Sequence, residues 1–460
     1  MTDTAGQIGT LDFIASEAGR KRASTNRRLR RIITEDPEWT LTIVPPLTDL
    51  CLQHIINNFE HNPIVEKLLP KYQKTVLQKL SISLPLSVTA NLISDEGYWK
   101  RVCTKRWEIC DISSYGDSWK RMFFERYMEN FIEHFIPGVT DPGVILDALP
   151  LCKNFIKKLN ITKLLPPIKM DLKKQEEEDT SDSGSDSGTD LPTTDHIDLS
   201  VIIEALPNLE ELHLVYGVKN CGMNFEWNLF EFTYPDCISL AKAIKFCKTL
   251  KVFKLCRSKV DDVKVRVLLS SMLDHPSMVH LDLSHNLIHD RGARAVGKVM
   301  NRSKLETVIL CNNRIHASGA QVIARALTKN TTLTTLNLRL NRLGDEGGQA
   351  ICQALLHNST LVNVHLGSNE LSEPTGIAIS LVLARNKTLR SINFSSNRIG
   401  LDGGKQLVEG ISDNRTLVEF DLRLTEVGQE NEFCINQVLK NNQERARLKA
   451  LQQLATPGPA

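Results

Sequence analysis

The sequence lacks several features on which secreted, metal-binding and membrane proteins depend. Its 11 cysteines are an odd number and include no Cys-x-x-Cys pair, which argues against a disulfide framework and against a zinc site. No apolar run approaches the roughly 18 residues that span a bilayer. The opening Met-Thr-Asp-Thr does not start a secretory signal. We therefore expect a protein of the reducing cytoplasm, without a membrane partner.

Nucleotide and nucleic-acid signals are missing as well. The formal net charge is only +2, from 56 basic and 54 acidic residues, so no overall field attracts nucleic acid. No glycine-rich loop is followed by Lys-Ser or Lys-Thr, the arrangement that cradles nucleotide phosphates. We expect no cofactor and no nucleic-acid partner. At 460 residues the chain exceeds the size of one compact core, which favours several domains or an extended repeat array.

Two segments differ from globular composition. Residues 20–31 carry seven basic side chains and little to bury, and we expect residues 1–45 to form a basic, flexible arm. Two interpretations of this arm stay open: a solvated terminus, and an electrostatic contact with an acidic partner such as a tubulin tail. Residues 171–196 are acidic and rich in Ser and Gly. They cannot bury enough apolar surface to order themselves, so we expect a disordered insertion.

Residues 46–170 are expected to form a helix-rich region that contains cryptic repeats. Two short pieces, 77–82 and 156–161, resemble strands, and the aromatic-rich segment 98–127 between them has helical spacing. Long basic side chains surround the aromatic ones there, which an ordinary helical core explains without a ligand. If both pieces are repeat strands, the repeats begin before the acidic insertion.

From residue 209 onward the chain repeats itself. The unit is Leu-x-x-Leu-x-Leu-x-x-Asn followed by a helix-forming stretch, and its first position recurs at 250, 278, 305, 333, 361, 389 and 417. This period of 28 residues, with a single 27, predicts stacked units with short parallel strands inside and helices outside. The fold class is therefore an α/β leucine-rich-repeat solenoid that resembles the ribonuclease-inhibitor horseshoe. We place the repeats at 197–440 and a carboxyl-terminal cap and tail at 441–460.

Asparagines and glycines recur in register with the repeats. The asparagines that end the strand motifs are expected to form a ladder that satisfies backbone groups; they are Asn286, Asn313, Asn341, Asn369 and Asn397. Six residues after the ladder position comes a glycine such as Gly292 or Gly319, where close approach of the backbone is expected. A second set, Asn330, Asn358, Asn386 and Asn414, matches the glycosylation motif. We expect these four to end helices in the left-handed conformation and to stay unmodified.

The repeats offer no catalytic constellation. His280, Asp282, Ser284 and His285 lie within six residues, but they occupy repeat positions and no base is set to activate a nucleophile. We therefore do not expect an enzyme. The outward strand positions are polar and of both signs, which is compatible with plain solubility or with a protein-binding face. The candidate protein-binding residues are His280, Asp282, Asn337, Arg339, Asn363, His365, Asn393, Glu419, Asp421 and Arg423.

Segments of the amino-terminal half indicate which family of leucine-rich-repeat proteins this sequence resembles. The segment WTLTIVPPLTDLCLQHIINNF at 39–59, the tryptophan-rich segment 98–127 and the acidic interruption together resemble the family of dynein regulatory complex subunit five, also called t-complex-associated testis-expressed proteins. The resemblance implies a non-catalytic scaffold of the nexin–dynein regulatory complex, in the axoneme of motile cilia and sperm flagella. Its partners would be other subunits of that complex, which links neighbouring doublet microtubules and restrains dynein-driven sliding. The family offers no catalytic residues to carry over.

Two other classes of function stay open. Residues 84–127 faintly resemble an F-box, which followed by repeats would make a substrate receptor of a ubiquitin ligase. A horseshoe of repeats can also cap and inhibit a soluble enzyme. Co-purification with axonemal subunits, with ligase adaptors or with a single enzyme separates the three.

Overall fold

The computed structural model describes residues 30–31, 43–166, 195–219, 223, 229 and 231–455. The chain divides into two compact units, with the division between Phe123 and Phe124. Most of the expected basic arm and of the acidic insertion lies outside the described residues. Within the arm, β1 (Arg30–Arg31) pairs antiparallel with β2 (Ile43–Val44). No helix of the described part is long and apolar enough to cross a membrane.

The amino-terminal unit is helical and packs around aromatic side chains. Trp99 is fully buried, donates from Nε1 to the carbonyl of Ile93 at 2.9 Å, and lies 5.0 Å from the ring of Phe123. This confirms that the aromatic-rich segment forms a core. The elements are α2 (Leu47–Asn57), α3 (Pro70–Lys79), α4 (Leu86–Leu92), α5 (Glu96–Arg106), the 3-10 turn η2 (Ser113–Tyr115) and the first turn of α6 (Trp119–His134).

The first predicted cryptic strand, at 77–82, is wrong because residues 77–79 form the end of α3 and Leu80 is its C-cap. Leucines three residues apart fit one face of a helix as well as they fit a repeat strand. Arg101 then donates to the carbonyls of Leu77 and Leu80, at 2.6 and 3.1 Å. These bonds satisfy backbone groups that the end of a helix leaves open. The array of strands therefore begins later than the sequence suggested.

The second unit holds one nine-stranded parallel sheet in which each strand pairs with its neighbours in the sequence. This confirms the predicted solenoid. The second cryptic piece, 156–161, contains the first strand of the sheet. The strands are β3 (Lys158–Ile161), β4 (Glu211–Leu214), β5 (Val252–Leu255), β6 (His280–Asp282), β7 (Thr307–Ile309), β8 (Thr335–Asn337), β9 (Asn363–His365), β10 (Ser391–Asn393) and β11 (Glu419–Asp421).

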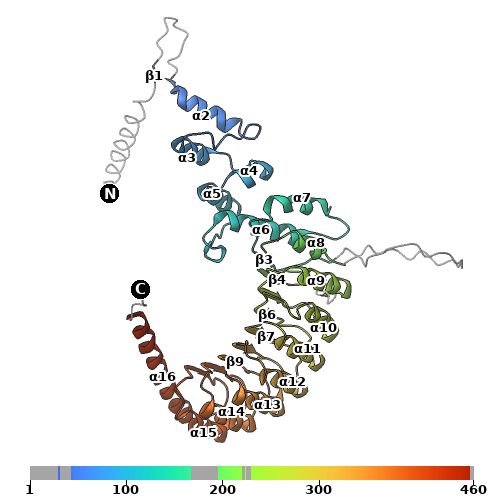
Figure 1. Cartoon of the computed structure of the whole chain (residues 1–460), viewed down its shortest axis with the longest axis vertical. Helices are drawn as coiled ribbons and strands as arrows, with labels where there is room; N and C mark the ends of the chain where they lie inside the picture. The colour runs from blue at the N-terminus through green and yellow to red at the C-terminus, as the bar shows by residue number, and fades with distance from the viewer. Residues whose placement is uncertain are drawn as a thin grey trace, which may run out of the picture. The chain divides into compact units, whose positions relative to one another are not determined.

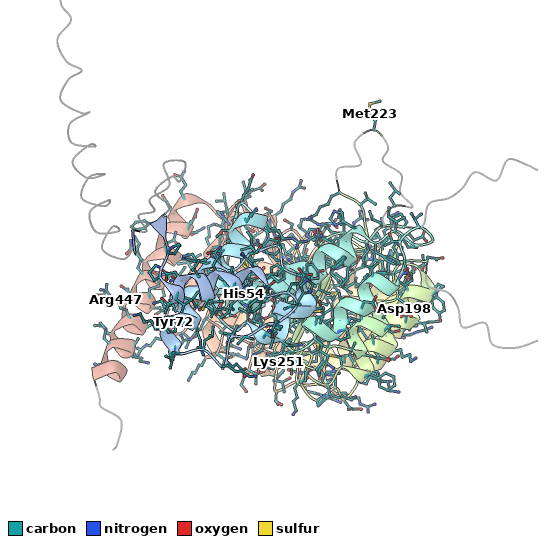
Figure 2. The ribbon with its side chains drawn as sticks, turned by 90° about the horizontal axis from the view of Figure 1, so that it is seen from above. His54, Tyr72, Asp198, Met223, Lys251 and Arg447 are labelled. Carbon is teal, nitrogen blue, oxygen red and sulfur yellow. The ribbon has the colours of Figure 1, made fainter. Side chains whose placement is uncertain are left out.

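Helices of successive repeats pack side by side on the outer side of this sheet (Figure 1). The last helix, α16, runs across residue 440, where the sequence placed a boundary. Figure 2 gives a perpendicular view in which Asp198, the N-cap of α8, is labelled. The helices are α7 (Gly143–Cys152), α8 (Leu199–Glu204), α9 (Tyr234–Phe246), α10 (Asp262–Ser271), α11 (Asp290–Met300), α12 (Ala317–Leu327), α13 (Gly344–His357), α14 (Glu373–Arg385), α15 (Gly400–Ile411) and α16 (Gln429–Ala455).

The predicted asparagine ladder is confirmed. Asn369 is fully buried, and its Nδ2 donates to the carbonyls of Leu338, Leu366 and Gly367 at 2.9 to 3.2 Å. Its Oδ1 accepts from the backbone N–H of Asn341 at 3.1 Å. One side chain thus joins two repeats through groups that water cannot reach.

The second set of asparagines forms another ladder, but not in the predicted conformation. Asn358 and Asn386 have φ of −85° and −74°, with extended ψ values, so the expected left-handed helix end is wrong. Asn358 donates from Nδ2 to the carbonyl of Leu327 and accepts the N–H groups of Thr360 and Leu361. The amide nitrogen that a glycan would need is therefore buried and hydrogen-bonded.

The predicted close approach at the glycines is also visible. A Cβ added to Gly292 would lie 2.6 Å from Ile288 Cγ2 and 2.7 Å from Asp262 Oδ1. The same Asp262 oxygen accepts the N–H of Gly292 at 3.0 Å and that of His289 at 2.7 Å. A carboxylate at the start of one helix thus holds the start of the next.

Side chains from helices cover both edges of the sheet. Along β3, carboxylate oxygens of α6 accept backbone N–H groups: Glu125 from Lys157 and Lys158, Glu129 from Asn160, and Glu133 from Thr162. At the other edge, Asn442 and Gln443 of α16 donate to the carbonyls of Leu417 and Val418. Because exposed edge groups invite pairing with other chains, these bonds end the array at both sides.

Candidate protein-binding face

The inner face of the sheet is built from short strands with one pattern. From β6 to β11 each strand has three residues, and only the central side chain is buried in the core. Successive side chains of a strand point to opposite faces, so the two flanking residues of each strand lie on the concave face. This face therefore displays two side chains per repeat.

Eight of the ten predicted residues are strand residues of this face. His280 and Asp282 flank the centre of β6, Asn363 and His365 that of β9, and Glu419 and Asp421 that of β11, while Asn337 ends β8 and Asn393 ends β10. Arg339 and Arg423 lie two residues beyond β8 and β11, and both are exposed.

The strand register arranges most of these residues in two adjacent rows. One row reads Asn337, His365, Asn393 and Asp421, and the other reads Thr335, Asn363, Ser391 and Glu419. The β6 residues lie apart from these rows, because β7 intervenes with Thr307 and Ile309. The rows thus join six of the predicted residues, from β8 to β11, and His280 and Asp282 are separated from them.

Comparison with known proteins places this architecture in a family. The model of the leucine-rich repeat matches residues 274–297, 329–352 and 385–408. Dynein regulatory complex subunit 5 of Macaca fascicularis is 62% identical over 424 residues, which cover 92% of this chain and 84% of that protein. The chain belongs to the dynein regulatory complex subunit 5 family. The family also reaches Chlamydomonas reinhardtii, whose subunit 5 is 33% identical over 49% of this chain and 50% of that protein.

A solved structure also resembles part of the chain. Leiomodin-1 actin-binding site 2 is 23% identical and covers 35% of this chain and 94% of that chain, with a TM-score of 0.33.

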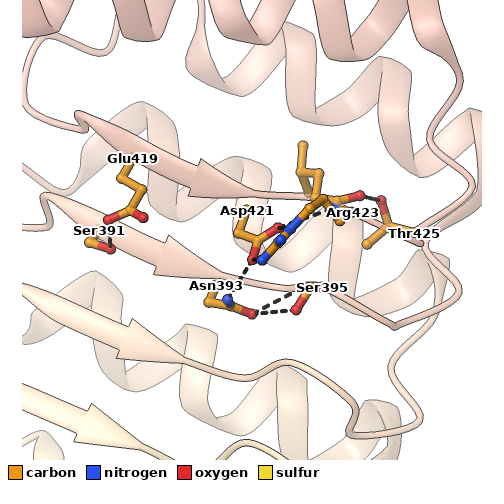
Figure 3. A network of polar contacts seen from close by, with 8 residues as sticks. Ser391, Asn393, Ser395, Glu419, Asp421, Arg423 and Thr425 are labelled. Carbon is orange, nitrogen blue, oxygen red and sulfur yellow. Dashed lines mark hydrogen bonds and ion pairs between the residues drawn. The ribbon is translucent and has the colours of Figure 1, made fainter. Parts of the chain in front are cut away.

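In this member of the dynein regulatory complex subunit 5 family, the carboxyl-terminal end of the concave face is a polar network (Figure 3). Asp421 accepts two bonds from the Arg423 guanidinium, at 2.8 and 2.7 Å, and one from Asn393 Nδ2 at 2.7 Å. The bonds from Arg423 lower the pKa of Asp421 below its ordinary value. Ser391 donates to Glu419 at 2.8 Å.

The two arginines border one hollow. Arg339 and Arg423 both line a cavity of about 690 Å³ beside the end of the sheet, although three repeats separate them in sequence. Ser395 and Ser396 contribute to the same wall, and Gln429 and Glu432 of α16 close the other side. Arg423 keeps 79% of its side chain exposed while it pairs with Asp421. The hollow is thus lined by side chains of both charges, Arg339 and Arg423 together with Glu426 and Glu432.

Sequence reasoning missed one histidine, His213, at the other end of the face, where the predicted His280 also lies. In the register of the sheet, His213 on β4 lies beside Lys254 on β5, which lies beside Asp282 on β6, whereas His280 pairs with Val252. Burial, and after it the positive charge of Lys254, lowers the pKa of His213 to about 4. Burial also lowers the pKa of His280. Both Nε2 atoms are buried without a hydrogen-bond partner. The strand copy at 209–214 departs from the regular repeat motif, so the motif does not predict its outward residues.

The stability of the protein should depend on pH because of His213. An unfolded histidine binds a proton below about pH 6.5, whereas the folded one does so only below about pH 4. As the pH falls, the unfolded state therefore binds its proton at a higher pH than the folded state does. The free energy of unfolding should decrease by up to about 3 kcal/mol between pH 7 and pH 4. Denaturation at both pH values measures this. His213→Gln should reduce the difference, and an unchanged difference would contradict the assignment.

The described residues do not form the nucleophilic or metal-binding arrangements that the sequence was searched for. The hydroxyl of Ser284 donates to Asp282, an acid rather than an imidazole, and His285 bonds instead to Asn312. Within the described part, no group of three or more His, Cys, Asp or Glu side chains is placed to hold a metal ion. The described cysteines are free thiols, and burial raises the pKa of Cys352 to about 12.

Proposed function

We propose that this chain is a non-catalytic scaffold subunit of the nexin–dynein regulatory complex, in the axoneme of motile cilia and flagella. There it helps to link doublet microtubules and to regulate dynein-driven sliding. The observation that carries the proposal is the 62% identity with a dynein regulatory complex subunit 5 over 92% of this chain. A complex subunit acts through its interfaces, so the proposal requires surfaces that bind other subunits.

The concave face supplies the first such surface. Its polar residues of both signs can fix a partner's register and orientation, since complementary charges give specificity more than raw affinity. The predicted residues from β8 to β11 form continuous rows, and Arg339 and Arg423 meet at one hollow. We propose that another subunit of the complex binds here. The basic arm at residues 20–31 is proposed to touch acidic tubulin tails, in line with its charge.

Fractionation of axonemes tests the proposed function. Demembranated axonemes are extracted with increasing salt, and this chain is followed together with other subunits of the complex. The proposal expects the chain to stay with the axoneme at low salt and to leave together with those subunits at higher salt. Recovery in the soluble fraction with ligase adaptors, or with one soluble enzyme, would refute it.

A further inference from the structure

The outer faces of three successive helices carry a group of basic side chains. Each of them is exposed, and none forms an ion pair with any residue that the structure describes. We call this group the outer basic patch; it consists of Arg266 of α10, Arg291, Arg294 and Lys298 of α11, Arg325 of α12 and Lys329, which follows α12.

Repeat spacing brings these residues together. Arg291, Arg294 and Lys298 are three and four residues apart, so they share one face of α11. Arg266 precedes Arg294 by 28 residues and Arg325 follows Lys298 by 27, which places them at equivalent positions of the neighbouring helices. These helices pack side by side on the outer side of the sheet (Figure 1). With about 1.5 Å of rise per residue and 8–10 Å between helix axes, the patch measures roughly 20 Å in each direction.

Charge in this part of the solenoid is unbalanced. Residues 234–330 contain 17 basic and 7 acidic residues, whereas residues 331–455 contain 13 of each. The acidic side chains near the patch are engaged in internal bonds. Asp290 accepts the N–H groups of His316 and Gly319, Asp262 those of His289 and Gly292, and Asp274 pairs with Arg302. None of these acidic side chains forms an ion pair with a residue of the patch, so the basic side chains are open to an external partner.

The surroundings of the patch decide which kind of partner fits. From the start of α10 to the end of α12, Val263 is the one large apolar side chain that is exposed, so the surface lacks the cluster of apolar groups that inserts into a membrane interface. The same stretch contains no Phe, Tyr or Trp, which leaves no aromatic platform on which single-stranded bases could stack. We propose that the outer basic patch binds an extended, acidic segment of a partner protein, rich in Glu or Asp.

This surface lies on the helical side, away from the concave face, and so goes beyond the proposed function. The test uses the full chain and a fluorescent 20-residue polyglutamate peptide, with binding followed by anisotropy. The variant Arg294→Glu/Lys298→Glu/Arg325→Glu should bind at least tenfold more weakly than the parent. The control Arg385→Glu/Lys387→Glu/Arg415→Glu changes the net charge equally on later repeats and should stay within about twofold. Thermal melting establishes that both variants are folded.

The neutral variant Arg294→Gln/Lys298→Gln/Arg325→Gln should show an intermediate loss, even if the reversed charges impair folding. An equal loss in the control would overturn the proposal, because overall charge alone would then govern binding. Tighter binding of a 20-residue oligothymidylate or of phosphatidylserine vesicles, lost in the patch variant, would also overturn it in favour of nucleic acid or membrane. The assay needs no axoneme, so its failure is distinct from failure of the proposed function.

Discussion

Replacing Asn369 by alanine is expected to destabilise the central repeats by roughly 3 kcal/mol or more. The side chain is fully buried and makes three hydrogen bonds to backbone carbonyls and one with a backbone N–H. Alanine would leave these groups without partners where water has no access. Because each repeat contacts only its neighbours, the loss should open the array locally. Native-state hydrogen exchange around residues 338–371 measures the opening free energy.

Asn363 provides the matched control in the same repeat. Its side chain lies on the concave face, half-buried, and donates only to Thr335 Oγ1 at 3.1 Å. Asn363→Ala should cost less than about 1 kcal/mol, since solvent can replace that bond. Equal protection losses in the two variants would show that the ladder does not stabilise the stack.

Leu338→Ala should cost about 2–5 kcal/mol through lost burial and the cavity that remains. Leu338 is fully buried in a repeat that packs between two neighbouring repeats. Water therefore cannot enter the cavity that alanine would leave. Hydrogen exchange should show lost protection near residues 305–370 before global unfolding. Leu340, two residues later, is 39% exposed and has a φ of 57°.

Leu340→Ala is therefore the control, with an expected cost below about 1 kcal/mol. If protection near residues 305–370 survives in Leu338→Ala, the repeat register described above is wrong.

The repeat region could be predicted from the sequence because one physical requirement recurs in every copy. An inward leucine and a ladder asparagine each have a single role in every repeat. Their spacing alone therefore predicts the positions of β6 to β11 and the backbone hydrogen bonds of ladder residues such as Asn369. The stretch 77–82 shows the limit of this reasoning. Two leucines there have the same spacing, but Leu77 lies in the last turn of α3 and Leu80 is its C-cap, where Arg101 donates to the carbonyl from 21 residues away.

Contacts between repeats were harder to predict than the repeats themselves. Asparagine tolerates the left-handed region, so the sequence predicts that conformation for Asn358, yet its side chain bonds to the carbonyl of Leu327 from an extended backbone. The Glu125, Glu129 and Glu133 series on α6 was overlooked, although a spacing of four places the three side chains on one helix face. That this face meets the edge of β3 is tertiary information that no local pattern contains.

Part of the candidate face was likewise beyond prediction. The outward positions of regular strands follow from alternation, which is why Asn393 and Asp421 were found. His213 was missed because the copy that holds it is irregular, and its environment depends on Lys254 from the next strand. The shared hollow at Arg339 and Arg423 depends on α16 folding back beside the last strand.

The central claim is that the concave face anchors this chain within an axonemal complex, and one measurement tests it most directly. Arg339→Glu/Arg423→Glu keeps the buried leucines and both asparagine ladders, and Arg423 is 79% exposed, so the fold should survive. Charge reversal at an interface lowers affinity, and 1.4 kcal/mol already corresponds to tenfold.

Salt extraction of axonemes that carry this variant is compared with extraction of axonemes that carry the control Arg385→Glu/Arg415→Glu, whose residues lie at the end of α14 and in the loop after α15. We predict that the concave-face variant is released at lower salt than the parent, while the control is released with the parent. Retention of the folded concave-face variant at every salt concentration that retains the parent would contradict the claim.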